Sequence, residues 1–354
     1  MQQIFQIGVG GNLKERRGLV DAISPGQDYN APLYYKSMKI DFEHVEPLPV
    51  IGAGLPLVLK GLFRNFSKCA LLHSLSQHPF YPLFRGKTVL ISTVHELQYR
   101  QFSEYNYLAE QTLKGWLWEN TVTKPGISCI LNSDYLLATS RQIRRGLIDA
   151  GFPRERIFLA PLGIRPEFFI TPKQYHERIG FKVGFLGTLG PQKNVEFAIE
   201  ANKYRPWAGD TMEFWGHSIY TQKQLKEMIG QDKRVKICGP LPEDKKVSIY
   251  DSFDVFVIPS RFEGFAMIIV EAKARGLPVV IWKDGKISPE IRKYTFEARD
   301  PEHMAEILGD LRSNGYNKKL QKKAIASAQK FTIKNMALGI LNAYEKIIEI
   351  KGIK

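Results

Sequence analysis

Short apolar runs that resemble β-strands alternate with stretches of helical periodicity along most of the chain. A first series of these runs comprises IFQIGVG at 4–10, CALLH at 69–73, TVLISTVH at 88–95 and YLLATS at 135–140. A second series, FKVGFLG, VKICG, DVFVIPS and LPVVI, lies between 181 and 281. Strands that alternate with helices predict parallel sheets covered on both faces. Two such series therefore predict an α/β chain with two doubly wound domains.

The two series meet near 166–176, PEFFITPKQYH, where prolines punctuate the chain. We accordingly predict an N-terminal domain over 1–168 and a C-terminal domain over 177–330. The length of 354 residues suits two domains of ordinary size. The last apolar-periodic segment predicts an amphipathic helix with a basic end over 332–352.

Composition narrows the class of protein. Hydrophobic residues make up 44% and charged residues 24% of the chain, which excludes a collagen or a largely disordered protein. No uncharged apolar run has the length of a membrane span, and the N-terminal apolar segment precedes its charges, so we expect no secretory signal. The three cysteines lie far apart, which disfavours a disulfide framework or a cysteine zinc site and favours the cytoplasm.

The net charge of +14 points to an anionic partner, such as nucleic acid, anionic lipid or a phosphate-bearing substrate. The basic excess occurs in both halves, whereas a nucleic-acid-binding module concentrates it on one face. We therefore expect no nucleic-acid partner, although such a protein remains an alternative, as does a merely basic surface.

One segment, 55–68, is a candidate for membrane contact. On a helix, its apolar and basic residues fall on different faces, which is typical of a peripheral helix on an anionic membrane. A helix packed on its own sheet fits the same pattern. The apolar and then the basic positions are Leu55, Leu59, Leu62, Phe63, Phe66, Lys60, Arg64 and Lys68.

Ligands of open parallel sheets bind at the carboxyl ends of the strands. One such place is PSRFEGFAMIIVEAKARGLPVV at 259–280, where a strand, a loop with Glu263 and Gly264, and a helix follow one another. The glycine lets backbone approach a ligand, and the free amides at the helix start suit a diphosphate. A carboxylate accepts two hydroxyl hydrogen bonds, so Glu263 and Glu271 suit sugar diols. Taken alone, the pair is better explained by a plainer interpretation, with Glu263 as a charge at the helix start and Glu271 on a solvated helix face.

The sequence around this pair of glutamates resembles that of the retaining GT-B glycosyltransferases of the family-four group. The Glu-x7-Glu pair, PSRFEGF and EAKARGLPVV fit that group's signature, and FLGTLGPQKN is similar to its glycine-lysine loop. VKICGPLPEDKKVSIYDSFDVFVIPS and DYLLATSRQIRRGLIDAGFPRERIFLAPLGI match further stretches. The resemblance implies two Rossmann-like domains facing a cleft, with a nucleotide-diphosphate sugar on the C-terminal domain and the acceptor on the N-terminal one. It also implies that the last helix packs back on the N-terminal domain.

The resemblance assigns roles in donor binding. Glu263 contacts hydroxyls of the donor sugar, and Glu271 holds the ribose hydroxyls. Backbone at Gly264, Phe265 and Ala266 caps the diphosphate. The nucleobase lies near Leu241.

The segment GTLGPQKN, 187–194, is a second strand end. It has Gly187 at the end of the strand, Asn194 as a candidate helix N-cap, and Lys193 as a cation for the leaving diphosphate. The family usually has an arginine directly after the first glycine, where this chain has Thr188. We therefore expect a weaker clamp that depends on Lys193, unless Arg261 or Lys283 replaces the missing cation.

The N-terminal domain offers two further candidates. His95 ends a strand, where a histidine is often structural, but the family places a histidine near the transferred sugar at the matching position. A dinucleotide fingerprint needs a third glycine where this chain has Leu13. The family instead uses a double glycine on the acceptor side, matched by Gly10 and Gly11.

The expected function is the transfer of a sugar from a nucleotide-diphosphate donor to an acceptor hydroxyl, with retention, in glycan or glycolipid biosynthesis. The acceptor is a glycan or a lipid-linked glycan. No Asp-x-Asp motif is present, so we expect neither a metal nor a cofactor. A nucleotide-sugar epimerase of the same fold remains an alternative.

Overall fold

The computed structural model divides the chain into two units, Met1–Gly163 with Ile333–Lys354 (unit 1) and Ile164–Thr332 (unit 2). The first unit thus ends slightly before the predicted boundary at 168. The structure describes residues 2–7, 20–22, 45–50, 63, 65, 67, 70–74, 82–96, 120, 128, 130–170, 180–205 and 209–353.

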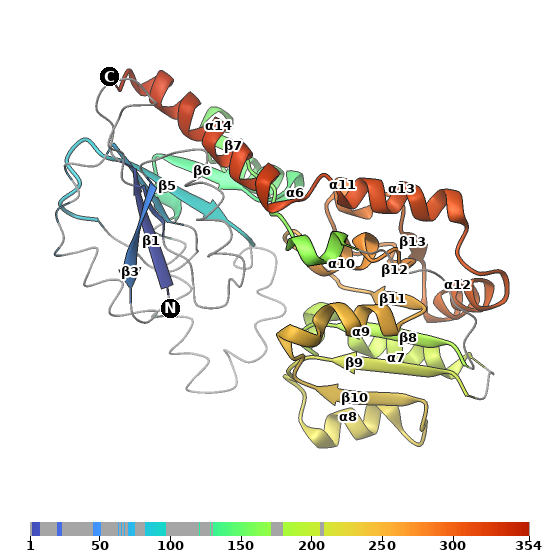
Figure 1. Ribbon diagram of the computed structural model, residues 1–354. Helices are drawn as coiled ribbons and strands as arrows, with labels where there is room; N and C mark the ends of the chain where they lie inside the picture. Colours follow the sequence, from blue (N-terminus) through green and yellow to red (C-terminus); the bar gives the residue numbers. More distant parts are fainter. Residues whose placement is uncertain are drawn as a thin grey trace. The chain divides into compact units, whose positions relative to one another are not determined.

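Unit 1 is built on a seven-stranded sheet with the order β3-β1-β2-β4-β5-β6-β7 (Figure 1). Strand β1 runs antiparallel to β2, β3 and β4, whereas β2, β4, β5, β6 and β7 pair in parallel. The prediction of a wholly parallel sheet is therefore wrong for β1, because alternation of apolar residues does not encode strand direction. The bounds are β1 Gln2–Ile7, β2 Val20–Ala22, β3 Val45–Val50, β4 Leu71–Ser74, β5 Val89–Val94, β6 Tyr135–Ala138 and β7 Ile157–Leu159.

The long C-terminal helix α14, Ile333–Lys351, completes the core of unit 1 (Figure 1). Its apolar face, including Ile340, Tyr344 and Ile347, packs against Leu71 and Leu137 of the sheet. All five side chains are buried, so the helical periodicity of the last segment reflects packing on this sheet. The shorter helix α6, Arg141–Asp149, follows β6 and is capped by Ser140, whose side chain accepts a hydrogen bond from the amide of Ile143.

Unit 2 has a six-stranded, wholly parallel sheet with the order β10-β9-β8-β11-β12-β13. Chain order reverses between β8 and β11, which lie side by side although two strands separate them in the sequence. This is the strand order of a dinucleotide-binding fold, and ligands bind at such a switch point. The strands are β8 Lys182–Leu186, β9 Thr211–Trp215, β10 Val235–Gly239, β11 Val255–Ile258, β12 Val279–Trp282 and β13 Phe296–Ala298.

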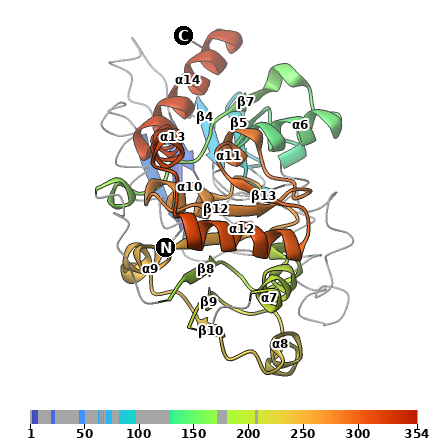
Figure 2. The same cartoon turned by 90° about the vertical axis from the view of Figure 1, so that its right-hand side faces the viewer.

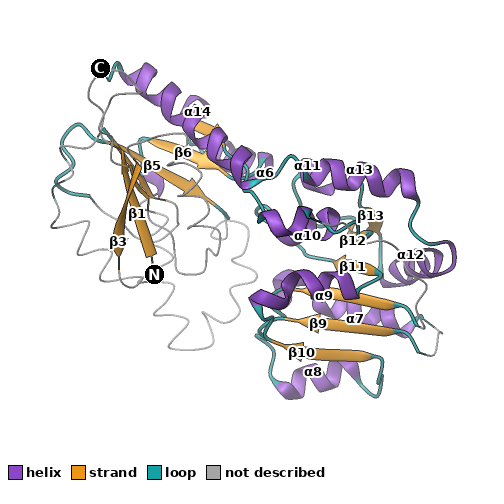
Figure 3. Ribbon diagram, in the orientation of Figure 1, coloured by secondary structure: helices purple, strands orange, loops and turns teal. Residues whose placement is uncertain are grey.

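Helices cover both faces of the unit 2 sheet (Figures 2 and 3). Figure 2 shows α9 on one side of β8, β9 and β10 and α7 with α8 on the other. The predicted α/β doubly wound fold is confirmed. The helices of this unit are α7 Val195–Lys203, α8 Gln222–Ile229, α9 Lys246–Ser252, α10 Met267–Ala274, α11 Pro289–Arg292, α12 Pro301–Asn314 and α13 Lys318–Ala328, with short 3-10 turns η3 Pro166–Phe169, η4 Pro191–Lys193 and η5 Glu243–Lys245.

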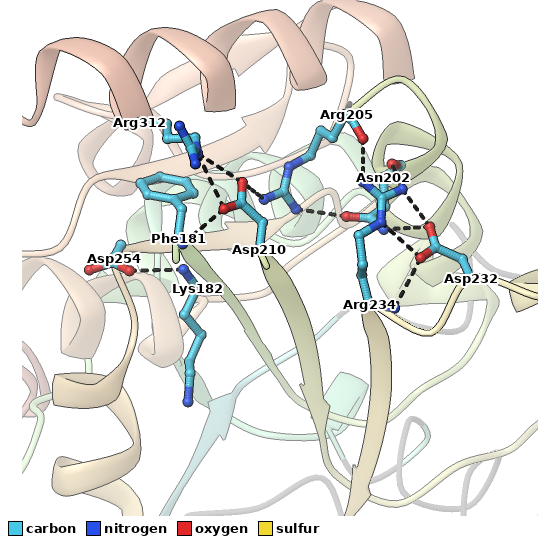
Figure 4. A network of polar contacts seen from close by, with 9 residues as sticks. All are labelled: Phe181, Lys182, Asn202, Arg205, Asp210, Asp232, Arg234, Asp254 and Arg312. Atoms are coloured by element: carbon cyan, nitrogen blue, oxygen red, sulfur yellow. Dashed lines mark hydrogen bonds and ion pairs between the residues drawn. The ribbon is translucent and has the colours of Figure 1, made fainter. Parts of the chain in front are cut away.

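The amino ends of the unit 2 strands are joined by a polar network (Figure 4). Buried Asp210, just before β9, lies 3.0 Å from Arg205 Nη2 and 3.1 Å from Arg312 Nε, and accepts a hydrogen bond from the amide of Phe181. Asp254, before β11, accepts one from the first amide of β8. Because these carboxylates satisfy backbone donors and arginines at the edge opposite the carboxyl ends, the network stabilises the sheet and leaves the other edge for a ligand.

Candidate active site

The loop after β8 is shaped by a close approach of two strand ends. Gly187 has a φ of +136°, and a Cβ on Gly216, which follows β9, would lie 1.9 Å from the Gly187 carbonyl oxygen. Only glycine fits at 216 without displacing this backbone. The chain then forms η4 and delivers Lys193, whose Cε would lie 3.6 Å from a Cβ on Gly187. The lysine side chain is thus held beside the end of β8.

Asn194 does not act as the predicted side-chain cap of α7. It occupies the N-cap position in the left-handed region, with a φ of 53°, and makes no capping hydrogen bond. Its Oδ1 instead accepts a hydrogen bond at 3.0 Å from Arg261 in the loop after β11. Asn194 therefore links the two loops at the switch point.

Glu263 lies in the loop after β11 and is 4% exposed. Its Oε1 accepts hydrogen bonds from Lys193 Nζ at 2.6 Å and from Ser260 Oγ at 2.6 Å. The carboxylate is therefore fixed between the carboxyl ends of β8 and β11. Both contacts use Oε1, so Oε2 retains lone pairs for another donor, such as a sugar hydroxyl.

Glu271 lies on α10 and is 2% exposed. Lys246 Nζ donates to its Oε1 at 2.8 Å, and Tyr250 OH donates to its Oε2 at 2.8 Å. Burial and the charge of Glu271 raise the pKa of Tyr250 well above its usual value, so this hydroxyl stays protonated. The interpretation of Glu271 as part of a solvated helix face is wrong, because its carboxylate is buried and has a lysine partner.

The diphosphate prediction concerns the backbone at the start of α10. Ala266 occupies the N-cap position with a φ of 59°, and the helix begins at Met267. Phe265 turns its ring into the interior against Phe331, with ring centroids 5.3 Å apart. Gly264 and Phe265 are both buried, so backbone amides rather than side chains face any anion at this helix start.

Arg261, one candidate for the cation missing at Thr188, is engaged within the loops of unit 2. Its Nη2 lies 3.2 Å from Glu196, and its Nε donates to the Pro191 carbonyl at 3.2 Å. The guanidinium also stacks over Trp282 at 5.8 Å. These contacts hold the guanidinium of Arg261 beside η4 and the start of α7.

The other predicted site residues belong to different elements of the two units. Thr188 is exposed in the loop after β8, and Leu241 is half-buried between β10 and η5. His95, half-buried, follows β5 in unit 1, while the donor-side residues belong to unit 2. Gly10 and Gly11 lie outside the described residues.

Sequence reasoning missed Ser260, Lys246 and Tyr250. Lys246 and Tyr250 are four residues apart on α9, and this spacing places two side chains on one helix face. That spacing was a usable signal, but nothing in the sequence indicates that the face meets Glu271. Within the described part of the chain, no group of three or more His, Cys, Asp or Glu side chains is placed to hold a metal ion.

His73 of β4 is a structural residue. It is fully buried, and its ring nitrogens contact Tyr344 OH and, at 2.8 Å, Thr93 Oγ1. Burial, with the nearby charge of His95, lowers its pKa from 6.5 to about 3. The ring is therefore neutral in the folded protein at ordinary pH.

This pKa shift predicts acid sensitivity. Below pH 6.5 the unfolded chain protonates His73 while the folded chain does not until about pH 3, so the free energy of unfolding falls as the pH drops through this window. The expected slope is at most roughly 1.4 kcal/mol per pH unit. Urea unfolding of wild-type protein and His73→Gln between pH 7 and pH 4 measures it. The slope should be shallower in His73→Gln and unchanged in the exposed-site control His217→Gln; equal slopes in all three would contradict the assignment.

One matching family model lies within unit 2. Residues 180–314 match the family described as glycosyl transferases group 1. The chain is 26% identical over 259 residues to the D-inositol 3-phosphate glycosyltransferase of Acidothermus cellulolyticus, covering 64% of this chain and 58% of that protein. It is 25% identical over 181 residues to O-antigen chain mannosyltransferase B of Escherichia coli, covering 46% of this chain and 45% of that protein. The match thus spans about half the length of these relatives.

The fold is shared with solved structures. The crystal structure of Anabaena HepE in complex with UDP-glucose superposes with a TM-score of 0.60 at 17% identity, covering 79% of each chain. None of the described helices is long and apolar enough to cross a membrane. By its matched family model and its relatives, the chain is similar to the family-four glycosyltransferases, and its fold is the GT-B fold.

Proposed function

We propose that the chain transfers a sugar from a nucleotide-diphosphate donor to an acceptor hydroxyl, with retention of anomeric configuration and without a metal ion. One observation carries the proposal: Glu263 and Lys193, from the loops after β11 and β8, form a 2.6 Å ion pair at the switch point of the unit 2 sheet. A buried carboxylate beside a cation at this position suits a sugar linked to a diphosphate.

The diphosphate lies between the amides at the start of α10 and the ammonium of Lys193. As the bond from the sugar to the diphosphate breaks, negative charge develops on the leaving oxygen. Lys193 and the helix amides stabilise that charge, and they are already in place, so no reorganisation is needed. This supplies the positive charge that a metal ion provides in other transferases.

The sugar and the nucleoside use the two glutamates. Glu263 accepts a sugar hydroxyl with the Oε2 that its own partners leave available. Glu271, fixed by Lys246 and Tyr250, accepts the ribose hydroxyls, and the base lies toward Leu241. The bound UDP-glucose of HepE, a protein of the same fold, supports a nucleotide sugar as the donor class.

In the transfer step, the acceptor hydroxyl attacks the anomeric carbon on the face from which the diphosphate leaves. The bond from that carbon to the acceptor oxygen forms as its bond to the phosphate oxygen breaks. The acceptor proton passes to the departing diphosphate, so no protein carboxylate acts as a nucleophile. His95 and the double glycine at 10–11 serve the acceptor side, with a glycan or lipid-linked glycan as the acceptor in glycan biosynthesis.

A transfer assay with labelled nucleotide sugars tests the proposal. Protein treated with a chelator should transfer sugar at most of the untreated rate, and the product should keep the donor's anomeric configuration by NMR. A loss above tenfold that magnesium or manganese restores would contradict the metal-independent step. Inverted product would contradict retention.

A further inference from the structure

Unit 1 contains a cavity of about 620 Å³ at the amino ends of β4, β5 and β6. His95, by contrast, follows the carboxyl end of β5. The cavity therefore lies at the opposite edge of the sheet from the predicted acceptor side, and no role in sugar transfer accounts for it. Four parts of the chain line it, namely Ser67 with Ala70, residues 85–89, Asp134, and Lys351, Gly352 and Ile353 at the end of α14.

The lining carries excess positive charge. Arg85 and Asp134 form an ion pair, and Asp134 Oδ2 also accepts a hydrogen bond from the amide of Leu90 at 2.7 Å, so these two charges cancel. Lys87 and Lys351 remain, both exposed, and no carboxylate of the described residues lies within ion-pair distance of either. Lys351 is held over the ring of Tyr135 at 5.6 Å. Lys87 and Lys351 thus add two ammonium groups, from separate parts of the chain, to the lining of the cavity, which suits a phosphate.

Large apolar side chains stand exposed beside these lysines. Leu83 and Phe84, directly before Arg85, are 66% and 57% exposed, and Ile350, directly before Lys351, is 60% exposed. Phe63 is 77% exposed, and a β-bridge between Asn65 and Phe84 brings the segment of Phe63 beside that of Phe84. Exposed leucine and phenylalanine next to the segments that line a basic cavity are expected where a protein enters the headgroup layer of a membrane.

We propose that this cavity binds the phosphate headgroup of an anionic lipid, and that the apolar rim formed by Phe63, Leu83, Phe84 and Ile350 enters the adjoining acyl layer. The charge complements a lipid phosphate, while the apolar rim has no function toward a phosphate dissolved in water. The site lies apart from the donor residues of unit 2, so it does not depend on the proposed transfer reaction. It does not rest on the membrane contact predicted for 55–68, a segment of which only Phe63, Asn65 and Ser67 lie among the described residues.

Vesicle co-sedimentation tests the charged part of the site. Wild-type protein should bind vesicles of phosphatidylcholine with phosphatidylglycerol, and pure phosphatidylcholine much more weakly. The double variant Lys87→Glu with Lys351→Glu should lose about tenfold or more in binding, since each basic residue at an anionic surface contributes about fivefold. The matched control Lys318→Glu with Lys319→Glu changes the same charge on α13 of unit 2 and should bind as wild type. Equal loss in both double variants would overturn the cavity as the site.

The apolar part needs its own variants. Leu83→Ser with Phe84→Ser should weaken vesicle binding, and Ile170→Ser, which alters a side chain 75% exposed in unit 2, should not. Thermal unfolding should be unchanged in all variants, because the altered side chains are exposed. Calorimetry with inorganic phosphate separates the two phosphate sources. Phosphate binding without vesicle binding, or vesicle binding that the cavity and rim variants leave intact, would overturn the lipid assignment.

Discussion

Replacing Lys193 with alanine is expected to reduce sugar transfer by roughly ten- to a hundredfold or more, because a charge-assisted contact contributes about 1.5–3 kcal/mol. Two features of the structure point to a large effect. Lys193 is the cation paired with the buried Glu263, at 2.6 Å. Arg261, one of the two alternative cations, is bound to Asn194 and Glu196. Turnover at saturating donor measures the loss.

Two further variants identify the source of the positive charge. Lys283, exposed directly after β12, is the matched control, and Lys283→Ala should transfer at the wild-type rate. Thr188→Arg restores the family's usual arginine and should be tolerated, with equal or tighter nucleotide binding. If Lys193→Ala keeps more than about a tenth of wild-type turnover, the single-lysine clamp is wrong, and loss in Lys283→Ala would then identify the replacement.

The second large effect is a division of roles between the two glutamates. Glu263→Gln should reduce turnover strongly and leave affinity for a free nucleotide nearly unchanged, because its partner is the sugar. Glu271→Gln should instead weaken binding of the nucleotide itself. Calorimetry with nucleoside diphosphate and rate measurements on both variants separate binding from turnover.

The partners of Glu271 provide the controls for this division. Tyr250→Phe removes one hydrogen bond to Glu271 and keeps the ring, so it should weaken nucleotide binding less than Glu271→Gln. Ser260→Ala removes the matching bond to Glu263 and should affect turnover instead. Equal loss of nucleotide affinity in Glu263→Gln and Glu271→Gln would contradict the assigned roles.

The candidate site of unit 2 could be located from the sequence because its signals are local. A strand, a glycine and a polar residue in succession predict a ligand loop, and Gly187, Lys193 and Glu263 follow that pattern. The contacts that fix the site are not local. Lys246 reaches Glu271 from another helix, and Arg261 joins two loops that are far apart in the chain, so only the packed sheet brings these groups together.

Two features of unit 1, the direction of β1 and the strand β3, could not be predicted from the apolar pattern. The direction of β1 depends on its neighbours in the sheet and not on its own apolar residues. The edge strand β3, VEPLPV, contains Pro47 and Pro49. Two prolines in six residues are typical of a loop, so the sequence alone does not indicate a strand here. Proline is tolerated there because an edge strand leaves one row of its amides unpaired.

The most direct test of the account is titration of the metal-free protein with UDP, GDP and ADP, followed by thermal unfolding. At least one of them should raise the melting temperature in wild-type protein, because a ligand that binds only the folded state stabilises it. The same ligand should give a much smaller shift in Glu271→Gln and a normal shift in Lys283→Ala. If no nucleoside diphosphate or nucleotide sugar shifts the wild-type melting temperature, unit 2 does not hold a nucleotide-sugar donor as proposed.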